Sequence, residues 1–315
     1  MKAVMYHYVR NADPEFPYFR FLELTDFSKQ LEFFGNRYGF VSKAEFMACL
    51  SEGRSMPGVV LTFDDGFVDH YDHVLPVLSK NDLWGIFYVP TAPLTEGRIL
   101  DVHRVHLLLG RYGGREIAAA LGALVRPEYL VPRHVEEFKN TTYVKQDNEE
   151  GVDFVKRTVN YYLRSSLRTE VLDHLMEEYF ADEKEIHDHF YMSPAQLTEL
   201  VNEGMTVGSH SVSHPVMSGL AGPDQEVEIN GSFDALGAIV GDLSPRTFCY
   251  PYGGAGTFTN ETEALLEEAG CRFSFSVEPR DVTTDDLVNR VQALPRFDCN
   301  EFPHVARDPS PSRMV

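Results

Sequence analysis

Two short motifs bring together side chains that could bind a metal ion and move a proton. In the first, the apolar run Val59–Phe63 ends in two adjacent carboxylates, Asp64 and Asp65. In the second, His210 and His214 lie four residues apart after another short apolar segment. Two imidazoles on one turn can reach a single metal ion, and adding one carboxylate leaves positions open for water and substrate. These residue types are therefore typical of a catalytic metal site.

Each motif also has a purely structural interpretation. Asp is favoured at helix N-caps, and a helix is expected over Asp69–Lys80, so the two aspartates alone could cap it. A histidine pair is often only structural. Pro215 disfavours a helical backbone at His214, so we expect an isolated turn after a strand, without the glutamate of metalloprotease helices. Found together, the motifs favour the metal site, because two adjacent carboxylates are costly unless a cation or a proton meets them.

The elements expected to position these residues alternate between strand and helix, which favours a mostly parallel α/β fold of the barrel kind. The expected strands are Val59–Phe63, Gly85–Val89, Met205–Gly208, Thr247–Tyr250, Arg272–Val277 and Val291–Leu294. The expected helices are Asp26–Tyr38, Asp69–Lys80 with a kink or late start at Pro76, Ser193–Gly204, Glu226–Val240 and Glu261–Glu268.

One long segment departs from this alternation. Residues 97–191 contain the helical stretches Val102–Leu109, Val152–Leu167 and Glu170–Phe180 and few strand signals. We interpret the chain as one barrel domain over residues 1–315 with a helical insertion at 97–191, because barrel enzymes place substrate-shaping elements after their strands. A Pro- and Ser-rich tail, 309–315, is expected to be flexible.

Composition excludes several classes of function. The formal charge is 28 − 48 = −20, which repels nucleic acid and anionic membranes. No stretch approaches the roughly 18 apolar residues of a membrane span. The segment Met1–Arg10 is typical of a short strand rather than a secretory signal, so a cytoplasmic location is expected. The four cysteines lie far apart without a Cys-x-x-Cys motif, so reduced thiols are expected. The oligomeric state is not predicted.

A third motif, Arg246–Gly254, runs from an apolar strand into a Pro/Gly loop. Taken with Thr62–Gly66 and Ser209–Pro215, in that order, it resembles the polysaccharide deacetylase family, which is homologous to the nodulation-factor deacetylase. The resemblance covers roughly Met1–Glu96 and Ser193–Phe302. It implies a distorted (β/α) barrel of about seven strands and hydrolysis of acetyl groups on sugars with a divalent metal ion.

The resemblance also implies roles for single residues. Asp65, His210 and His214 become the metal ligands, with zinc expected first and cobalt, nickel or manganese as alternatives. Asp64 becomes the general base, because a carboxylate on the metal cannot easily take a proton as well. Arg246 is then expected to keep this base ionised and oriented.

The oxyanion and the leaving group need partners too. The backbone N–H of Tyr252 is expected to face the developing oxyanion. The family usually takes its general acid, a histidine, from a late apolar strand, and His304 has no such strand before it. His7 does follow a strand, as in the circularly shifted branch of the family, so we expect His7 rather than His304 to be the acid. Arg296 or Asp298, after the last expected strand, could tune the acid or the base.

The function expected from these motifs is metal-dependent removal of N-acetyl groups from an amino sugar or an N-acetylated saccharide precursor. An oligosaccharide or a nucleotide- or lipid-linked sugar would suit such an enzyme. Two alternatives remain open: another C–N hydrolase on this scaffold, such as a deformylase or a cyclic-amide hydrolase, and a glycosyltransferase that uses the aspartates to hold a metal–nucleotide. The glycosyltransferase leaves the histidine pair unexplained. Fold alone does not separate these functions.

Overall fold

The structure is a computed structural model that describes residues 1–140, 142 and 148–304. Its chain forms two compact units. The first unit comprises Met1–Asn11, Phe21–Gly97 and the chain from His187 to the last described residue. The second comprises Ala12–Arg20 and the described part of Arg98–Ile186, so it contains most of the expected insertion 97–191. The expected flexible tail, 309–315, lies outside the described residues.

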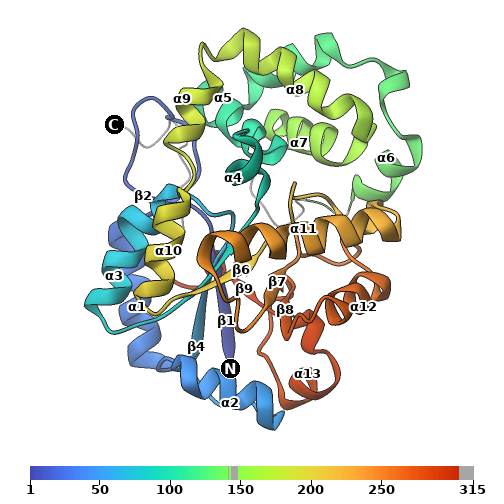
Figure 1. The fold of residues 1–315 in the computed structure, drawn as a ribbon. Coiled ribbons are helices and arrows are strands. Elements are labelled where there is room, and N and C mark those ends of the chain that lie inside the picture. Colours follow the sequence, from blue (N-terminus) through green and yellow to red (C-terminus); the bar gives the residue numbers. More distant parts are fainter. Residues whose placement is uncertain (141, 143–147, 305–315) are drawn as a thin grey trace. The chain divides into compact units, whose positions relative to one another are not determined.

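The first unit is built around a sheet of seven parallel strands in the order β8-β7-β6-β5-β4-β1-β9 (Figure 1). These strands are β1 (Lys2–Tyr6), β4 (Val59–Phe63), β5 (Ile86–Val89), β6 (Thr206–Ser209), β7 (Thr247–Cys249), β8 (Phe273–Phe275) and β9 (Phe297–Asp298). A separate two-stranded sheet joins β2 (Val9–Arg10) and β3 (Leu22–Glu23). The sheet curls into an open barrel with helices around it, which confirms the expected fold class.

Both faces of the central strands are buried, which explains why these strands are nearly continuous apolar runs. Successive side chains of a strand point to opposite faces. Leu61 and Phe63 of β4 pack in the cluster that contains Phe27 of α1 (Leu24–Arg37). Val60 packs on the other side, in the cluster that contains Tyr88 of β5. The sheet is therefore a rigid frame, and its strand ends are well suited to holding side chains in place.

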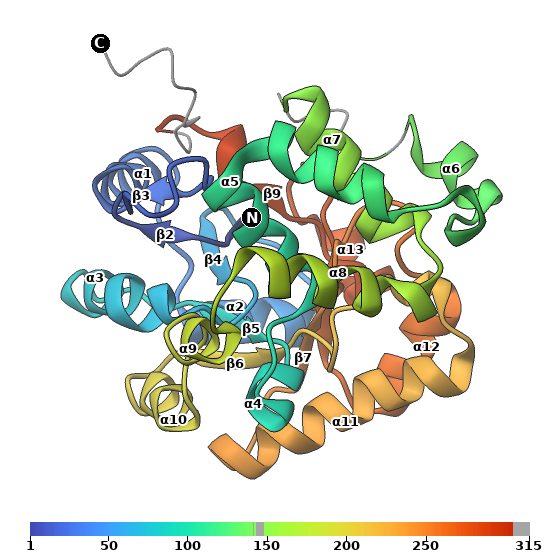
Figure 2. The same ribbon diagram turned by 90° about the horizontal axis from the view of Figure 1, so that it is seen from above.

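Helices follow one another around the outside of this sheet, as α1, α3, α10, α11 and α12 show in Figure 2. Besides α1, the helices of the first unit are α2 (Lys43–Glu52), α3 (Leu75–Lys80), α4 (Ala92–Glu96), α10 (Pro194–Asn202), α11 (Gly222–Val240), α12 (Asn260–Glu268) and α13 (Thr284–Asn289). Four of them, α2, α10, α12 and α13, begin with a capping box that satisfies backbone N–H groups at the helix start.

Two expected elements of the first unit differ from the structure, and in the second unit the expected helix Val152–Leu167 is broken at residues 163–164. Val291–Leu294 is not a strand: Val291–Ala293 forms a 3₁₀ turn, and Leu294 makes a single bridge to Phe275. The polar side chain of Gln292 explains the turn, because it accepts a hydrogen bond from Ser274 Oγ and donates one to the Cys271 carbonyl, both 2.7 Å long. The expected helix Asp69–Lys80 begins as a π-helix, His70–Val74, and becomes α-helical only at Leu75, next to Pro76.

The second unit is helical. Its helices are α5 (Asp101–Leu124), α6 (Pro132–Phe138), α7 (Glu150–Arg157) and α8 (Ser165–Tyr179), with a π-helix at Thr158–Tyr162, and the chain passes back to the first unit within α9 (Glu183–Asp188). Arg104 of α5 is buried and donates to Asp173 of α8 and to Glu183 of α9 at 2.6–2.8 Å. This ion network, in which the arginine is buried and the acidic partners are partly exposed, ties three helices together.

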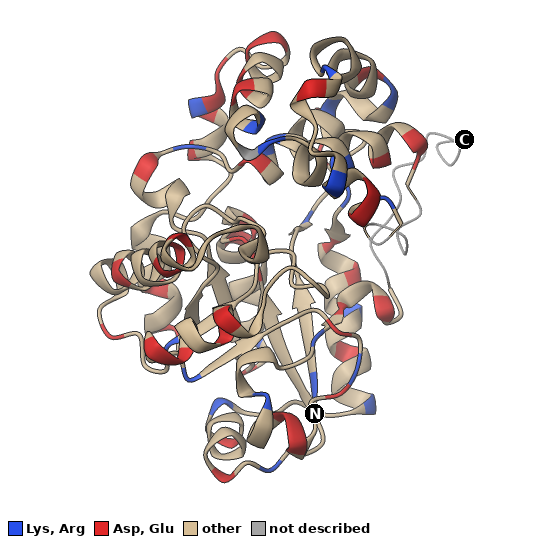
Figure 3. Ribbon diagram, turned by 90° about the vertical axis from the view of Figure 1, so that its right-hand side faces the viewer, with Lys and Arg blue, Asp and Glu red and all other residues tan. Residues whose placement is uncertain are grey.

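Charged residues are distributed unevenly between the strands and the rest of the chain. The strands are almost free of Asp, Glu, Lys and Arg, which lie mainly on helices and loops (Figure 3). Among the described residues, no helix combines the length and the hydropathy that crossing a bilayer requires. The long helix α5 contains charged side chains, including Arg104.

Candidate active site

Three polar segments follow the carboxyl ends of parallel strands in the first unit. His7 follows β1, Asp64 and Asp65 follow β4, and His210 follows β6. The backbone of Asp64 continues the ladder by donating to the Tyr6 carbonyl at 2.9 Å. Because the carboxyl ends of parallel strands meet at one edge of a sheet, these side chains gather there, where α/β enzymes place their active sites.

Asp65, His210 and His214 form a compact buried group. The Nε2 atoms of His210 and His214 each lie 3.5 Å from Oδ1 of Asp65. Ligand atoms bound at about 2.1 Å in a tetrahedral arrangement would lie roughly 3.4 Å from one another. Both spacings fit that value, so the three residues suit a divalent metal ion such as zinc.

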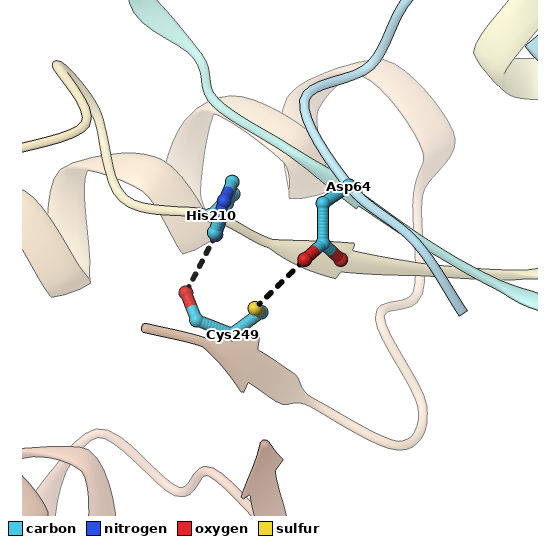
Figure 4. Close-up of side chains that lie close together, drawn as sticks. All are labelled: Asp64, His210 and Cys249. Atoms are coloured by element: carbon cyan, nitrogen blue, oxygen red, sulfur yellow. Dashed lines mark hydrogen bonds between the residues drawn. The ribbon is translucent and has the colours of Figure 1, made fainter. Parts of the chain in front are cut away.

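The protonation of His210 also suits metal binding. Its Nδ1 lies 2.7 Å from the Cys249 carbonyl (Figure 4). A carbonyl only accepts, so Nδ1 must carry the proton, and burial lowers the pKa of His210 and favours the neutral ring. The lone pair of Nε2 is then directed to the Asp65 side of the ring. A histidine that ligates a metal is commonly oriented by such a bond from its other nitrogen.

Backbone strain marks the same residues. Asp65, Ser211 and His214 have φ values of 79°, 65° and 57°, in the left-handed region that residues other than glycine seldom adopt. The segment between the two histidines is an irregular turn, as expected from Pro215. Strain of this kind costs about 1–3 kcal/mol per residue and clusters at functional sites. The turn therefore keeps its shape only because other groups hold it.

Asp64 has a different partner from Asp65. The guanidinium of Arg296, which is 0% exposed, donates from Nη1 to Oδ1 and from Nη2 to Oδ2 of Asp64, both at 2.8 Å. Burial alone would raise the pKa of Asp64, but the charge and hydrogen bonds of Arg296 outweigh it and lower this pKa to about 2. Asp64 is therefore an ionised carboxylate beside the three potential ligands.

The expected contact between Arg246 and Asp64 is wrong. Arg246 precedes β7, and its Nη1 donates to the Ala269 carbonyl at 2.8 Å. The three residues of β7 separate it from the carboxyl end of the strand, and at about 3.3 Å per residue this places it roughly 10 Å below the edge where Asp64 lies. Arg296, one of the two residues expected to tune the acid or the base, pairs with Asp64 instead.

Cys249, which no cysteine motif singled out, is the neighbour that sequence reasoning missed. Its Sγ lies 3.5 Å from Asp64 Oδ2 (Figure 4). The same sulfur lies 2.8 Å from Arg296 Nη2. Asp64, His210 and Cys249 form a second group with the spacing of metal ligands. It is the poorer site, because burial raises the pKa of the Cys249 thiol, His210 Nδ1 is already bonded, and Arg296 already supplies a cation.

Of the two histidines considered as general acid, the structure brings His7 to the site. His7 Nε2 lies 4.0 Å from Oδ2 of Asp65, and its ring is partly exposed. Its backbone carbonyl accepts a 2.7 Å hydrogen bond from the buried ring of His70, on the π-helix that follows β4. His304 is exposed, and its carbonyl accepts from Gln30 of α1.

Tyr252 also lies beside the proposed ligands. Its φ is 62°, and the Gly253 N–H donates to the Pro251 carbonyl at 2.7 Å, so Tyr252 is the central residue of a tight three-residue turn. Its ring packs edge-on against His214, with ring centroids 5.0 Å apart. Asp298 instead caps the turn that follows β9, by accepting from the Asn300 N–H.

Comparison with known proteins identifies this arrangement. The sequence matches the model of the polysaccharide deacetylase family over residues 52–274, more than half of the chain. The chain belongs to the polysaccharide deacetylase family. This confirms the resemblance carried by the three motifs and makes the protein a carbohydrate deacetylase, the class of enzyme expected for removal of an N-acetyl group.

Solved structures agree on the fold of the deacetylase. The Streptococcus pyogenes deacetylase PplD in complex with acetate superposes with a TM-score of 0.57 at 17% identity, over 95% of this chain and 91% of that one. The BpsB deacetylase domain from Bordetella bronchiseptica gives 0.51 at 14% identity, over 94% and 95%. BC0361, a polysaccharide deacetylase from Bacillus cereus, gives 0.52 at 14% identity, over 94% and 64%. No protein of curated function matches the deacetylase.

Proposed function

We propose that this deacetylase is a metal-dependent N-deacetylase of an amino sugar, with Asp65, His210 and His214 as the metal ligands. The observation that carries the proposal is the pair of 3.5 Å spacings from the imidazole nitrogens to one oxygen of Asp65. Two imidazoles and one carboxylate suit zinc, with cobalt, nickel or manganese as alternatives. A divalent ion held there would polarise the acetyl carbonyl and make water more acidic.

Asp64 is the proposed general base. Its ion pair with Arg296 keeps it ionised and fixes both carboxylate oxygens, so it can accept a proton from the attacking water. A second carboxylate is needed because Asp65 serves the metal. The low pKa of Asp64, about 2, ensures that the base is charged at neutral pH.

His7 and Tyr252 are proposed to complete the reaction. As the water oxygen bonds to the acetyl carbon, the backbone N–H of Tyr252 would stabilise the negative charge on the carbonyl oxygen. As the C–N bond breaks, His7 would give a proton to the leaving amine, and the acetyl group would depart as acetate. The partly exposed ring of His7, 4.0 Å from Asp65, supports this role.

For the substrate we propose a broad class of N-acetylated sugars. A short N-acetylated saccharide, or a nucleotide- or lipid-linked precursor, suits an enzyme that works in the cytoplasm, and the four buried free cysteines are usual for a reducing compartment. A screen of such N-acetylated sugars for released acetate and released formate tests the substrate and separates a deacetylase from a deformylase.

The test of the site combines removal of the metal with substitution of the proposed base. Removal of the metal with a chelator should abolish acetate release, and added zinc or cobalt should restore it. Asp64→Asn should keep metal binding but lose nearly all hydrolysis, whereas Asp72→Asn, a change at an exposed residue, serves as the matched control. Full activity of the chelated protein, or of Asp64→Asn, would refute the assignment.

His7 is tested by changing the leaving group of the substrate. His7→Ala should slow release of a poorly leaving amine by about 100-fold or more, and slow hydrolysis of an activated acetyl ester much less. An equal loss on both substrates would show that His7 is not the general acid.

A further inference from the structure

The turn that separates the two proposed histidine ligands is bound to the side of helix α11. Glu228 of α11 accepts hydrogen bonds at Oε2 from the backbone N–H groups of Val212 and Ser213, both 2.8 Å long. Its Oε1 accepts from Ser213 Oγ at 2.5 Å. One carboxylate therefore holds two consecutive peptide groups and one side chain of the turn.

One turn later along α11, Ser232 makes a second attachment. Its Oγ lies 2.5 Å from Oγ of Ser209, at the end of β6. Ser209 Oγ accepts from the Ser211 N–H at 3.1 Å, and Ser211 Oγ accepts from the His214 N–H at 3.0 Å. A chain of hydrogen bonds thus runs from the helix to the backbone of the second histidine.

The backbone of the turn explains why it needs this support. Ser211 and His214 both have φ values in the left-handed region, so the shape that aims His214 at Asp65 is not one that the local sequence prefers. Consecutive N–H groups next to a left-handed residue converge and bind an anion. Glu228 is that anion, supplied by the fold, and it stabilises this backbone shape over the relaxed alternatives.

We propose that Glu228 is a positioning residue for the metal site: by holding the Val212–Ser213 peptide groups, it sets the direction of the His214 ring relative to Asp65. This role rests on the proposed function, because only the proposed metal site gives His214 a metal ion to bind. Outer partners that orient metal ligands typically contribute about 10–100-fold in metal affinity. Glu228 belongs to none of the three sequence motifs, and it lies outside the ligand group.

The test measures the zinc affinity of metal-free protein by competition with a chromophoric chelator, together with the melting temperature of the metal-free form. Glu228→Ala should weaken zinc binding about 10–100-fold. Glu228→Gln should stay within about 3-fold of wild type, because an amide oxygen still accepts from both N–H groups and its NH₂ can donate to Ser213 Oγ. Glu226→Ala, at an exposed position of α11, is the matched control and should leave the affinity unchanged.

The outcomes separate this role from the proposed function. If wild type binds zinc and His214→Ala does not, but Glu228→Ala binds as tightly as wild type, the positioning role is wrong and the metal site stands. If wild type itself does not bind zinc, the proposed metal site is wrong, and the positioning role is wrong with it. A loss of zinc affinity in Glu228→Ala at an unchanged melting temperature supports positioning over a general role in folding. Should that variant not fold, Glu228→Asp, whose shorter side chain cannot reach all three donors, is expected to show an intermediate loss of affinity, and wild-type affinity there would overturn the role.

Discussion

Replacement of Arg296 by methionine is the sharpest test of how the site is built. Arg296 is buried and donates two 2.8 Å hydrogen bonds to Asp64, besides its contacts with Thr62 and Cys249. Removal of one partner of a buried ion pair costs about 3–5 kcal/mol in the free energy of unfolding. The pKa of Asp64 gives a lower bound on this free-energy cost. Its change from 3.8 to about 2 corresponds to roughly 2–3 kcal/mol at about 1.4 kcal/mol per pKa unit. We therefore expect Arg296→Met to lose about 3 kcal/mol or more of stability.

Activity should fall as well, because the base loses the cation that keeps it ionised and oriented. General acid–base catalysis commonly contributes about 100–10,000-fold, so we expect kcat for acetate release to drop by at least 100-fold. The assay follows acetate release under substrate saturation, alongside urea unfolding. Arg296→Lys keeps a charge but loses the two-pronged contact, so it should fall between wild type and Arg296→Met.

The pH dependence of stability has a defined sign. The pKa of Asp64 is lower in the folded protein than in the unfolded chain, so its ionised form stabilises the fold above about pH 4, and this contribution is lost as the pH falls towards about 2. The difference in unfolding free energy between wild type and Arg296→Met should therefore narrow over that range. A constant difference would show that the ion pair is not its source.

Arg246→Met is the matched control, because this exposed arginine donates to the Ala269 carbonyl and lies over the Phe233 ring, away from Asp64. It should change stability by less than about 1 kcal/mol and leave kcat within a few-fold of wild type. If Arg246→Met proved more damaging to kcat than Arg296→Met, our assignment of the cation beside Asp64 would be refuted.

Three further variants probe the frame around the site. His70→Phe keeps an aromatic ring but removes the donor to the His7 carbonyl, so urea unfolding should show a loss of about 1–3 kcal/mol. Amide hydrolysis should slow more than ester hydrolysis, and an equal slowing on both substrates would contradict a link to the acid. Arg104→Met should destabilise the second unit by about 2–3 kcal/mol, less than for a fully buried ion pair, because the acidic partners of Arg104 are partly exposed. Hydrogen exchange in α5 and α8 should rise, and unchanged exchange would contradict the role of this ion network. Gly208→Ala would place a Cβ 2.6 Å from a ring carbon of Tyr88. Thermal unfolding should therefore show a loss of about 1–3 kcal/mol in stability, whereas wild-type stability would show that the strands can move apart.

Much of the fold was predictable because its signals are local. The strand Val59–Phe63 was predicted with its observed bounds, since five buried apolar or β-branched residues seldom adopt another structure when glycine and polar residues flank them. The strand expected at Val291–Leu294 failed for a non-local reason. The side-chain bonds of Gln292 hold it in a turn, and they depend on where the chain places Ser274 and Cys271.

The sequence by itself determined the chemistry of the site. Asp64 and Asp65 are neighbours, and His210 and His214 share one turn, so their proximity within each motif needs no tertiary information. Residue type then sets what they can do: carboxylates accept protons, and carboxylates and imidazoles bind divalent metal ions. The match to the deacetylase family, over residues 52–274, includes these same short segments.

Only the tertiary structure decided which groups support those residues. Arg296 lies 232 positions from Asp64 in sequence, and it reaches this carboxylate because β9 pairs with β1, which pairs with β4. Arg246 carries the same charge and lies in a motif, yet it lies at the wrong end of its strand. Glu228 likewise meets the histidine turn through the packing of α11. A partner of this kind is chosen by strand order, strand direction and helix packing, and these depend on contacts that no local pattern records.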